Sequence, residues 1–325
     1  MADDVTLAFK LYILMVLTIN GTGYILLVRY TRSREGPMYY STTTVMLTEI
    51  SKLLISLMIL IKEHRSIRGM ISDVYMNVIC KPSDSFKMCI PSVIYAIQNN
   101  LAFFALSNLD AATYQVTYQL KVLTTAMFMV LMIGKPISRT QWTALLILFT
   151  GIALVQLDSA NVKQDSHYNY TYGLVAIILS CLCSGFAGVY FEKVLKGSDT
   201  SLWIRNVQMY LFGIISAFIG VVTKDGNNIM EHGFLYGYNF SIYCIIGMAS
   251  IGGLYTSVVV KYTDNIIKGF STAVSIVASV ICSYFMFGSS FGQYFLVGAG
   301  LVMLAIYLYS LPKPAPKAAP VTQNV

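Results

Sequence analysis

The chain of 325 residues is divided into long apolar stretches by short polar breaks, and this pattern constrains its fold more than any other feature. Each stretch is roughly 18 to 23 residues long, which is the length that a helix needs to cross a bilayer. The stretches cover residues 8–30, 39–61, 87–107, 111–133, 140–157, 172–193, 202–223, 238–260, 265–287 and 290–310. We therefore expect an all-α membrane protein with ten transmembrane helices.

Composition supports a membrane location, because 56% of the residues are apolar and only 11% are charged, too few to cover a soluble globule. Of the 22 Lys and Arg residues, fifteen lie on the side of the two termini, five lie on the opposite side and two lie within the stretches. Basic residues gather on the cytosolic side of membranes, so both termini are predicted to be cytosolic. The acceptor triplet at Asn169 would then face the lumen of the secretory pathway.

A weak internal repeat divides the chain into two halves. A shift of 154 residues aligns Asp110 with Asp264, Met132 with Met286, Gly134 with Gly288, Ile152 with Ile306 and Leu154 with Leu308. Five helices per copy is an odd number, so the second copy would be inverted in the bilayer, as in alternating-access transporters. The predicted units are residues 1–157, residues 158–311 and a flexible cytosolic tail, 312–325. The alternative is a chance alignment of apolar helices with loop glycines.

Lys121 is the most informative polar residue, because the run 113–133 around it is otherwise uncharged. A charge within a membrane helix costs about 3 kcal/mol and normally faces a protein interior or a wet cavity. On a continuous helix, Tyr114, Tyr118 and Thr125 would share its face. This stripe favours an anionic ligand, and the alternative is that Lys121 pairs with a buried carboxylate such as Glu49.

Other polar residues within the stretches suggest further parts of a site. Glu49 and Lys52 stand three apart, so they either form a structural ion pair or present Lys52 to a substrate. Lys268 either binds a phosphate or extends to the membrane interface. The amides of Gln98, Asn99 and Asn100, with Tyr95, suit the edge of a nucleobase or else link helices, and the small residues Ser184, Gly185 and Gly188 either pack on another helix or let a ligand approach the backbone. Asn206 and Tyr210 share one helical face, and Ser271, Thr272, Ser275 and Ser279 form a stripe of hydroxyls after Lys268.

Motifs of enzymes are missing from the sequence. It contains no Gly-rich phosphate loop ending in Gly-Lys-Ser/Thr, no His-Glu-x-x-His zinc motif and no Gly-x-Ser-x-Gly nucleophile elbow. The six cysteines show no paired metal-ligand spacing. We expect neither catalysis, nor a metal, nor a cofactor. The predicted partners are a small molecule and membrane lipids, and not nucleic acid.

Four blocks of sequence resemble the nucleotide-sugar transporters of the Golgi membrane, and the resemblance covers nearly the whole chain: Gln98–Leu101, Ala105–Lys121, Ser184–Lys193 and Lys261–Phe270. It implies an antiporter that imports a nucleotide sugar into the lumen and returns the nucleoside monophosphate. Residues 199–210 and 252–260 are similar to members that carry CMP-sialic acid, whereas 122–126 are closer to the UDP-sugar pattern. The expected substrate is CMP-sialic acid, with UDP-galactose or UDP-N-acetylglucosamine as the alternative.

The resemblance also implies which residues of this chain meet the substrate. The residues around the nucleoside would be Gln98, Asn99, Tyr114, Thr117, Tyr118 and Lys121. Those near ribose, phosphate or sugar would be Lys52, Ser184, Gly185, Asn206, Tyr210 and Lys268. Supporting roles would fall to Glu49, Tyr95 and Thr125.

Overall fold

The computed structural model describes residues 6–33, 36–106, 108–109, 114, 117–159, 170–287 and 294–311. Within these ranges the chain folds only into α-helices and short π-helical turns, without strands. Several predicted features lie outside the described residues, namely Asp110 and Gly288 of the repeat, the acceptor Asn169 and the tail 312–325. The all-helical class that the sequence predicts is confirmed.

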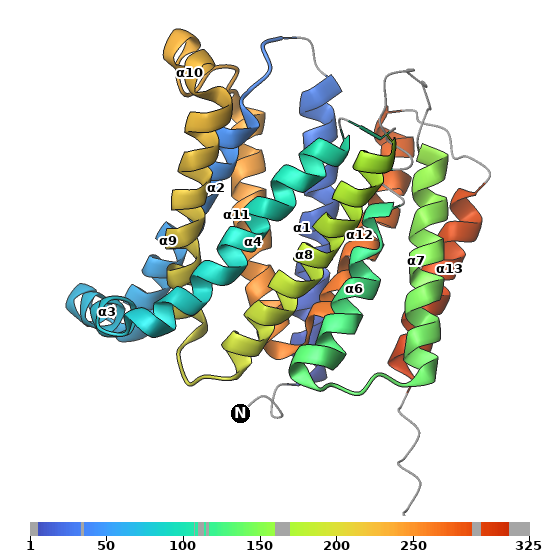
Figure 1. The fold of residues 1–325 in the computed structure, drawn as a ribbon, viewed down its shortest axis with the longest axis horizontal. Helices are drawn as coiled ribbons and strands as arrows, with labels where there is room; N and C mark the ends of the chain where they lie inside the picture. Colours follow the sequence, from blue (N-terminus) through green and yellow to red (C-terminus); the bar gives the residue numbers. More distant parts are fainter. Residues whose placement is uncertain are drawn as a thin grey trace, which may run out of the picture.

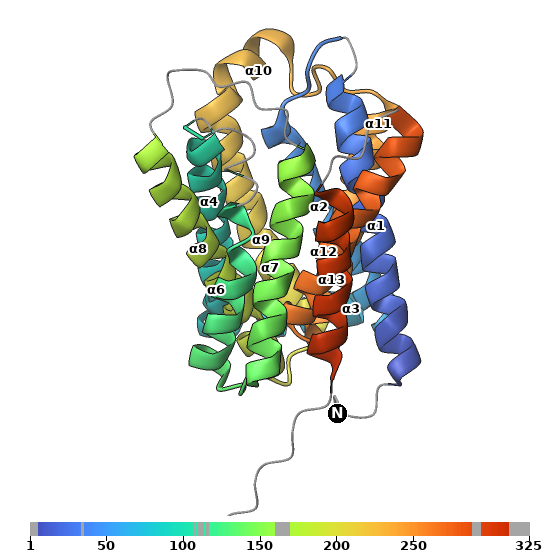
Figure 2. The ribbon, with the colours of Figure 1, turned by 90° about the vertical axis from the view of Figure 1, so that its right-hand side faces the viewer.

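Most helices run side by side through one bundle, and α1 begins at the same end of the bundle at which α13 ends (Figure 1, Figure 2). The long helices are α1 (Leu7–Ser33), α2 (Ser41–His64), α4 (Pro82–Leu106), α7 (Arg139–Ser159), α8 (Tyr170–Lys196), α9 (Leu202–Gly220), α11 (Phe240–Tyr262), α12 (Asn265–Phe287) and α13 (Phe295–Ser310). The shorter elements are α3 (Ile67–Val74), η1 (Tyr75–Ile79), α6 (Lys121–Phe128), η2 (Met129–Ile133), η3 (Val221–Asp225) and α10 (Gly226–His232).

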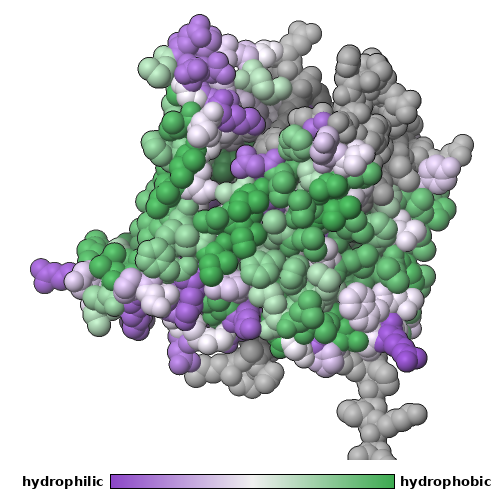
Figure 3. All heavy atoms as spheres, viewed as in Figure 1, coloured by the Kyte–Doolittle hydropathy of each residue, from purple (hydrophilic) through white to green (hydrophobic). Residues whose placement is uncertain are grey.

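Among the described residues, six helices are long and apolar enough to cross a membrane, which makes the chain a multi-pass membrane protein. They span Leu7–Thr31, Ser41–His64, Thr171–Lys196, Leu202–His232, Phe240–Tyr262 and Asn265–Met286. Three apolar helices are shorter, Lys121–Ile133, Arg139–Val155 and Phe295–Ser310. Large apolar side chains cover much of the outer surface of the bundle (Figure 3), as expected where lipid replaces water.

Two short helices occupy segments that the sequence analysis treats as polar connections. Ser66 begins α3, and its hydroxyl accepts a hydrogen bond from the Gly69 amide at 3.4 Å. In α10, Gly226–His232 continues from the turn η3 at the end of α9. Each helix by itself is far shorter than a membrane span, although α10 forms the end of the apolar stretch Leu202–His232.

The tightest helix contact joins α7 to α13. A Cβ atom added to Gly151 would lie 2.9 Å from the Gly298 carbonyl oxygen, and one added to Gly298 would lie 2.7 Å from the Gly151 carbonyl oxygen. Both glycines therefore permit a backbone-to-backbone approach that any side chain would prevent. Next to this contact, the largest apolar core gathers residues of α6, α7, α8, α12 and α13.

The other helices pack in pairs whose pattern bears on the predicted repeat. α1 packs on α11 and α12, while α8 packs on α4 and α6. α2 packs on α9. In addition, α2 contacts α11 and α9 contacts α4. The charged and amide side chains singled out in the sequence come from several of these helices.

Candidate functional site

Lys121 is the first residue of α6 and not the middle of a continuous helix, because residues 119 and 120 form a turn. Its ammonium lies over the ring of Tyr118, 4.4 Å from the centroid. The rings of Tyr118 and Tyr114 are stacked with centroids 5.8 Å apart. Of the three residues predicted to share a face with Lys121, Tyr118 thus lies beside its ammonium and Tyr114 stacks on Tyr118. The Thr125 hydroxyl instead donates to the Lys121 carbonyl at 2.7 Å, so it serves the helix backbone.

No carboxylate of the described residues lies within ion-pair distance of Lys121. The alternative pairing with Glu49 is not seen, since that carboxylate binds Lys52. The ring of Tyr118 offers a cation–π attraction, worth about 2 kcal/mol when desolvated, which only partly offsets the cost of burying an ammonium. The site therefore favours an anion that would complete the neutralisation.

Lys52 has a different environment. Its ammonium lies 2.5 Å from Glu49 Oε1 and over the ring of Tyr210, 4.5 Å from the centroid. Two glycines on neighbouring helices make room for the pair, because an added Cβ would lie 2.7 Å from Glu49 Oε2 at Gly213 and 2.7 Å from Lys52 Cδ at Gly253. The pair is thus enclosed by α9 and α11, and Lys52 is already neutralised.

Two buried amides each keep an oxygen without a hydrogen-bond partner among the described residues. Gln98 Nε2 donates to the Tyr118 hydroxyl at 3.0 Å, which leaves Oε1 unpartnered. Asn206 Nδ2 donates to Ser257 Oγ at 2.9 Å, which leaves Oδ1 unpartnered. Buried polar atoms without partners are rare and costly, so both oxygens suit donor groups of a ligand.

Lys268, in the first turn of α12, also has no ion pair among the described residues. Helix α12 contacts α6, which begins with Lys121, so the two lysines lie on neighbouring helices. The Lys121 ammonium repels that of Lys268, while the Glu192 carboxylate attracts it. A dianionic phosphate placed between them would relieve this repulsion. The clearest electrostatic reason for an anion site is Lys121, which has an aromatic ring beside it but no carboxylate partner among the described residues.

The hydroxyls that follow Lys268 hold helices together instead of facing a ligand. Ser271 Oγ lies 2.8 Å from Thr18 Oγ1 of α1, and Ser275 Oγ donates to the Thr18 carbonyl at 3.0 Å. Thr272 and Ser279 donate to carbonyls of their own helix. Two hydroxyls of the stripe therefore join α12 to α1, and the other two serve the backbone of α12.

Gly185, predicted to approach the substrate, lies against α6. A Cβ at this position would lie 2.7 Å from Thr124 Oγ1 and 2.9 Å from the Thr125 backbone nitrogen. It therefore permits close packing of α8 on α6 next to Lys121, which is a structural role. Its neighbour Ser184 is half-buried, as are Thr117 and Tyr95, and Asn99 is exposed.

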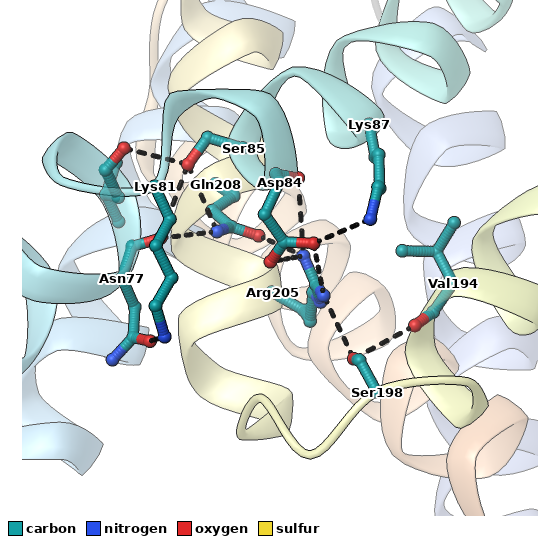
Figure 4. A network of polar contacts seen from close by, with 10 residues as sticks. Asn77, Lys81, Asp84, Ser85, Lys87, Val194, Ser198, Arg205 and Gln208 are labelled. Carbon is teal, nitrogen blue, oxygen red and sulfur yellow. Dashed lines mark hydrogen bonds and ion pairs between the residues drawn. The ribbon is translucent and has the colours of Figure 1, made fainter.

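The sequence analysis missed a polar network at the end of the bundle where α4 and α9 begin (Figure 4). Arg205 is fully buried there. Its Nη1 lies 2.8 Å from Asp84 Oδ2 and donates to Gln208 Oε1 at 2.9 Å, while its Nη2 donates to Ser198 Oγ at 2.9 Å. The network fastens the start of α9 to the start of α4. The sequence analysis counted Arg205 among the basic residues at the ends of the membrane helices, and such a count cannot show that its side chain is buried.

A second network closes the same end between α8 and α12. The Glu192 carboxylate accepts hydrogen bonds from the Lys196 ammonium at 2.6 Å and from the backbone amide of Asn265 at 2.9 Å. Beside it, Lys135 pairs with Asp264, whose other oxygen caps the first turn of α12 through the Ile267 amide at 2.8 Å. These bonds hold the α11–α12 connection against the connection that follows η2.

Two surface pockets lie outside the region of the lysines. One, of about 520 Å³, is lined by Asp73, Asn77, Lys81, Asp84, Ser198, Asp199, Thr200, Ser201, Ile204 and Arg205. The other, of about 410 Å³, is lined by Thr31, Gly36, Pro37, Met38, Tyr39, Tyr236, Gly237, Tyr238, Asn239 and Ile242. Neither is lined by a residue predicted to bind substrate, so the candidate site is defined by charge and by unpartnered amide oxygens.

Comparison with known proteins gives a consistent picture. A family model described as nucleotide-sugar transporter matches residues 5–310. The UDP-galactose translocator of Bos taurus is 45% identical over 94% of this chain and 78% of its own length. The UDP-N-acetylglucosamine transporter of Rattus norvegicus is 44% identical over 92% of this chain and 95% of its own.

A solved crystal structure has the same fold. It superposes with a TM-score of 0.69 over 94% of this chain and 97% of its own, at 12% sequence identity. At that identity the likeness concerns the arrangement of the helices alone.

Proposed function

The chain belongs to the nucleotide-sugar transporter family, and from this premise we propose that it exchanges a nucleotide sugar for a nucleoside monophosphate across the Golgi membrane. The observation that carries the proposal is Lys121, whose ammonium lies over the Tyr118 ring but has no carboxylate within ion-pair distance among the described residues. Lys268, on the neighbouring α12, likewise has no ion pair among the described residues. Substrate and returning product both carry phosphate, which supplies the missing negative charge. A neutral solute would not.

The proposed nucleoside is uridine, so the substrate would be UDP-galactose or UDP-N-acetylglucosamine and the counter-substrate UMP. This follows the names of the relatives at 44–45% identity, together with the UDP-sugar pattern of residues 122–126. CMP-sialic acid is the second candidate. It is favoured by Tyr210, which lies under Lys52, and by Ser257, which binds Asn206, since both belong to the blocks similar to CMP-sialic acid carriers.

Within the site, the Gln98 and Asn206 amide oxygens would accept hydrogen bonds from base or ribose donors. The rings of Tyr114 and Tyr118 would offer an aromatic surface beside Lys121, and Lys52 would be presented by Glu49. Lys121 and Lys268 would share the phosphate. Such an arrangement binds both members of the exchange through their common nucleotide and leaves the sugar as the variable part.

The proposed architecture is ten spans in two inverted halves, with both termini cytosolic. Packing supports it, because a two-fold relation that exchanges α1 with α8, α2 with α9, α4 with α11, α6 with α12 and α7 with α13 turns the most extensive helix contacts into one another. Smaller contacts, such as that of α11 with α8, have no comparable counterpart under this relation among the described residues. Under that relation α1 on α11 and α12 becomes α8 on α4 and α6. The contacts α2 on α9 and α7 on α13 map onto themselves. Two such halves can rock about a site between them.

Exchange in place of net uptake follows from the charges. An empty carrier would have to change conformation with the Lys121 ammonium uncompensated in a low-dielectric region, and a bound phosphate removes that penalty. The loaded carrier would therefore interconvert faster than the empty one.

A nucleotide panel tests the proposal on purified protein. UMP should raise the melting temperature more than CMP, AMP or GMP, and labelled UDP-galactose should enter sealed proteoliposomes only when UMP is inside. Greater stabilisation by CMP would select the second candidate. Stabilisation by none of the nucleotides, or chemical conversion of the labelled sugar without transport, would refute the proposed function.

A further inference from the structure

The short helix α3 and the turn η1 that continues it form a surface that substrate exchange does not use. The chain leaves α2 at Arg65, whose backbone is left-handed (φ 52°), and turns into α3. In Figure 1, α3 is seen along its axis at one end of the bundle, so it runs across the long helices. A helix so placed lies where the membrane meets water.

One face of this segment is already covered by the protein. Met70, Val74 and Val78 pack on the apolar cluster around Leu60 of α2 and Ile204 of α9. This contact fixes which way the segment is turned.

A second apolar face is left uncovered. Ile67, Ile71, Tyr75 and Ile79 recur every four residues and are 61%, 57%, 56% and 61% exposed. This spacing places them in one row along the segment. A row of this kind, beside a packed face and in a segment that also carries polar Ser72 and Asp73, is typical of helices that lie in a membrane interface.

The charges around the row are mostly basic. Lys62, Arg65, Arg68 and Lys81 are exposed, against one exposed carboxylate, that of Glu63. The other carboxylate of the segment, Asp73, is engaged by His64 at 3.0 Å and by Asn77 at 2.7 Å. The exposed apolar row is thus accompanied by cations that acidic headgroups would neutralise.

We propose that α3 and η1 bind the surface of the surrounding leaflet, with the row Ile67, Ile71, Tyr75 and Ile79 at the acyl-chain boundary and with acidic phospholipid headgroups at Arg65 and Arg68. The occupant is lipid because the row begins where the membrane-spanning α2 ends and continues the apolar outer surface of the bundle (Figure 3). Unlike the substrate site, this surface requires no nucleotide.

The full-length protein in proteoliposomes allows a direct test by fluorescence quenching. Ile71→Trp places a reporter in the row, and Ser72→Trp places one on the next residue, turned away from it. Vesicles contain lipids brominated near the top of the acyl chain, and the emission of wild-type protein, with native Trp142 and Trp203, is subtracted. Quenching should be at least about threefold stronger for Ile71→Trp. Equal quenching of the two reporters, or none, overturns the proposal, and Tyr75→Trp repeats the test if Ile71→Trp does not fold.

The headgroup part is tested with Arg65→Gln and Arg68→Gln in the Ile71→Trp background. Brominated phosphatidylserine should quench more than brominated phosphatidylcholine at the same mole fraction, and each substitution should lower that preference about fivefold. Arg139→Gln, an exposed arginine after η2, is the matched control and should leave the preference unchanged. An unaltered preference in both arginine variants would refute the headgroup assignment. Because the readout is lipid contact, a failed nucleotide panel does not affect it.

Discussion

Lys52 and Lys121 are the same residue in comparable apolar settings, yet the protein treats their charges differently. Lys52 has a carboxylate 2.5 Å away as well as an aromatic ring, whereas Lys121 has only the ring of Tyr118 among the described residues. A paired ammonium is part of the fold, and an unpaired one lowers the stability of the empty protein. The comparison shows that Glu49 neutralises Lys52 within the fold, whereas under the proposed function an anionic ligand would neutralise Lys121.

The largest expected effect comes from removing the unpaired charge. Lys121→Gln should weaken nucleotide binding about 100-fold, the loss of one charge-assisted contact of roughly 3 kcal/mol. The empty protein should melt at a higher temperature, because an uncompensated charge is gone. Thermal unfolding with and without UMP measures both effects. A variant that binds normally, or that becomes less stable when empty, would contradict the distinction between the two lysines.

Breaking the paired charge should act in the opposite sense. Glu49→Gln leaves Lys52 without its carboxylate and should destabilise the empty protein by about 2 kcal/mol, less than for a fully buried pair because both side chains are partly exposed. The double variant Glu49→Gln/Lys52→Met should recover most of that stability. Exchange should stay low in the double variant, as measured in proteoliposomes. Full exchange would make the pair purely structural.

The aromatic rings should matter unequally. A double-mutant cycle between Tyr118→Leu and Lys121→Gln should give a coupling energy of about 2 kcal/mol, because the ring stands alone against that charge. The corresponding cycle between Tyr210→Leu and Lys52→Met should give about 0.5 kcal/mol, since Glu49 already neutralises the ammonium. Unfolding in denaturant provides all the free energies. Similar coupling energies in the two cycles would mean that Glu49 does not weaken the attraction between Lys52 and the Tyr210 ring.

The smallest effect is expected from a single hydroxyl. Tyr118→Phe keeps the ring under Lys121 but removes the acceptor of the Gln98 amide, worth about 1 kcal/mol. Nucleotide affinity should fall about fivefold, with a smaller difference between UMP and CMP. Tyr114→Phe, which keeps the stacked ring, serves as the control in the same binding assay. An unchanged affinity in Tyr118→Phe would mean that Gln98 does not need this anchor.

Helix bounds could be read from the sequence because lipid imposes both a minimum length and an apolar composition. The stretch 265–287 matches α12, and the start predicted at 202 matches α9, whose first turn is capped by Ser201. The helices α3 and α10 were not predicted, since each is too short to meet the length rule by itself. Lys121 was predicted within a continuous helix, but turn geometry at residues 119–120 is set by tertiary packing that a periodic pattern does not contain.

Pairings within one helix could be predicted, and pairings between helices could not. Glu49 and Lys52 are three residues apart, so their contact follows from helix geometry. The bond from Gln98 to Tyr118 joins two helices, and the burial of Arg205 against Asp84 joins residues 121 positions apart. The spacing of residues carries no information about such contacts. For the same reason the contact of Ser271 with Thr18 of α1 could not be predicted from the spacing of the hydroxyls along α12.

The meeting of Gly151 with Gly298 has a mechanical consequence. Where two backbones touch without side chains between them, no rotamer can change to absorb sliding, so a shift of one helix along the other would collide with carbonyl oxygens at once. α7 and α13 are therefore expected to move as one rigid pair. In a carrier whose halves rock, this pair would stay fixed while the helices on either side of it change position.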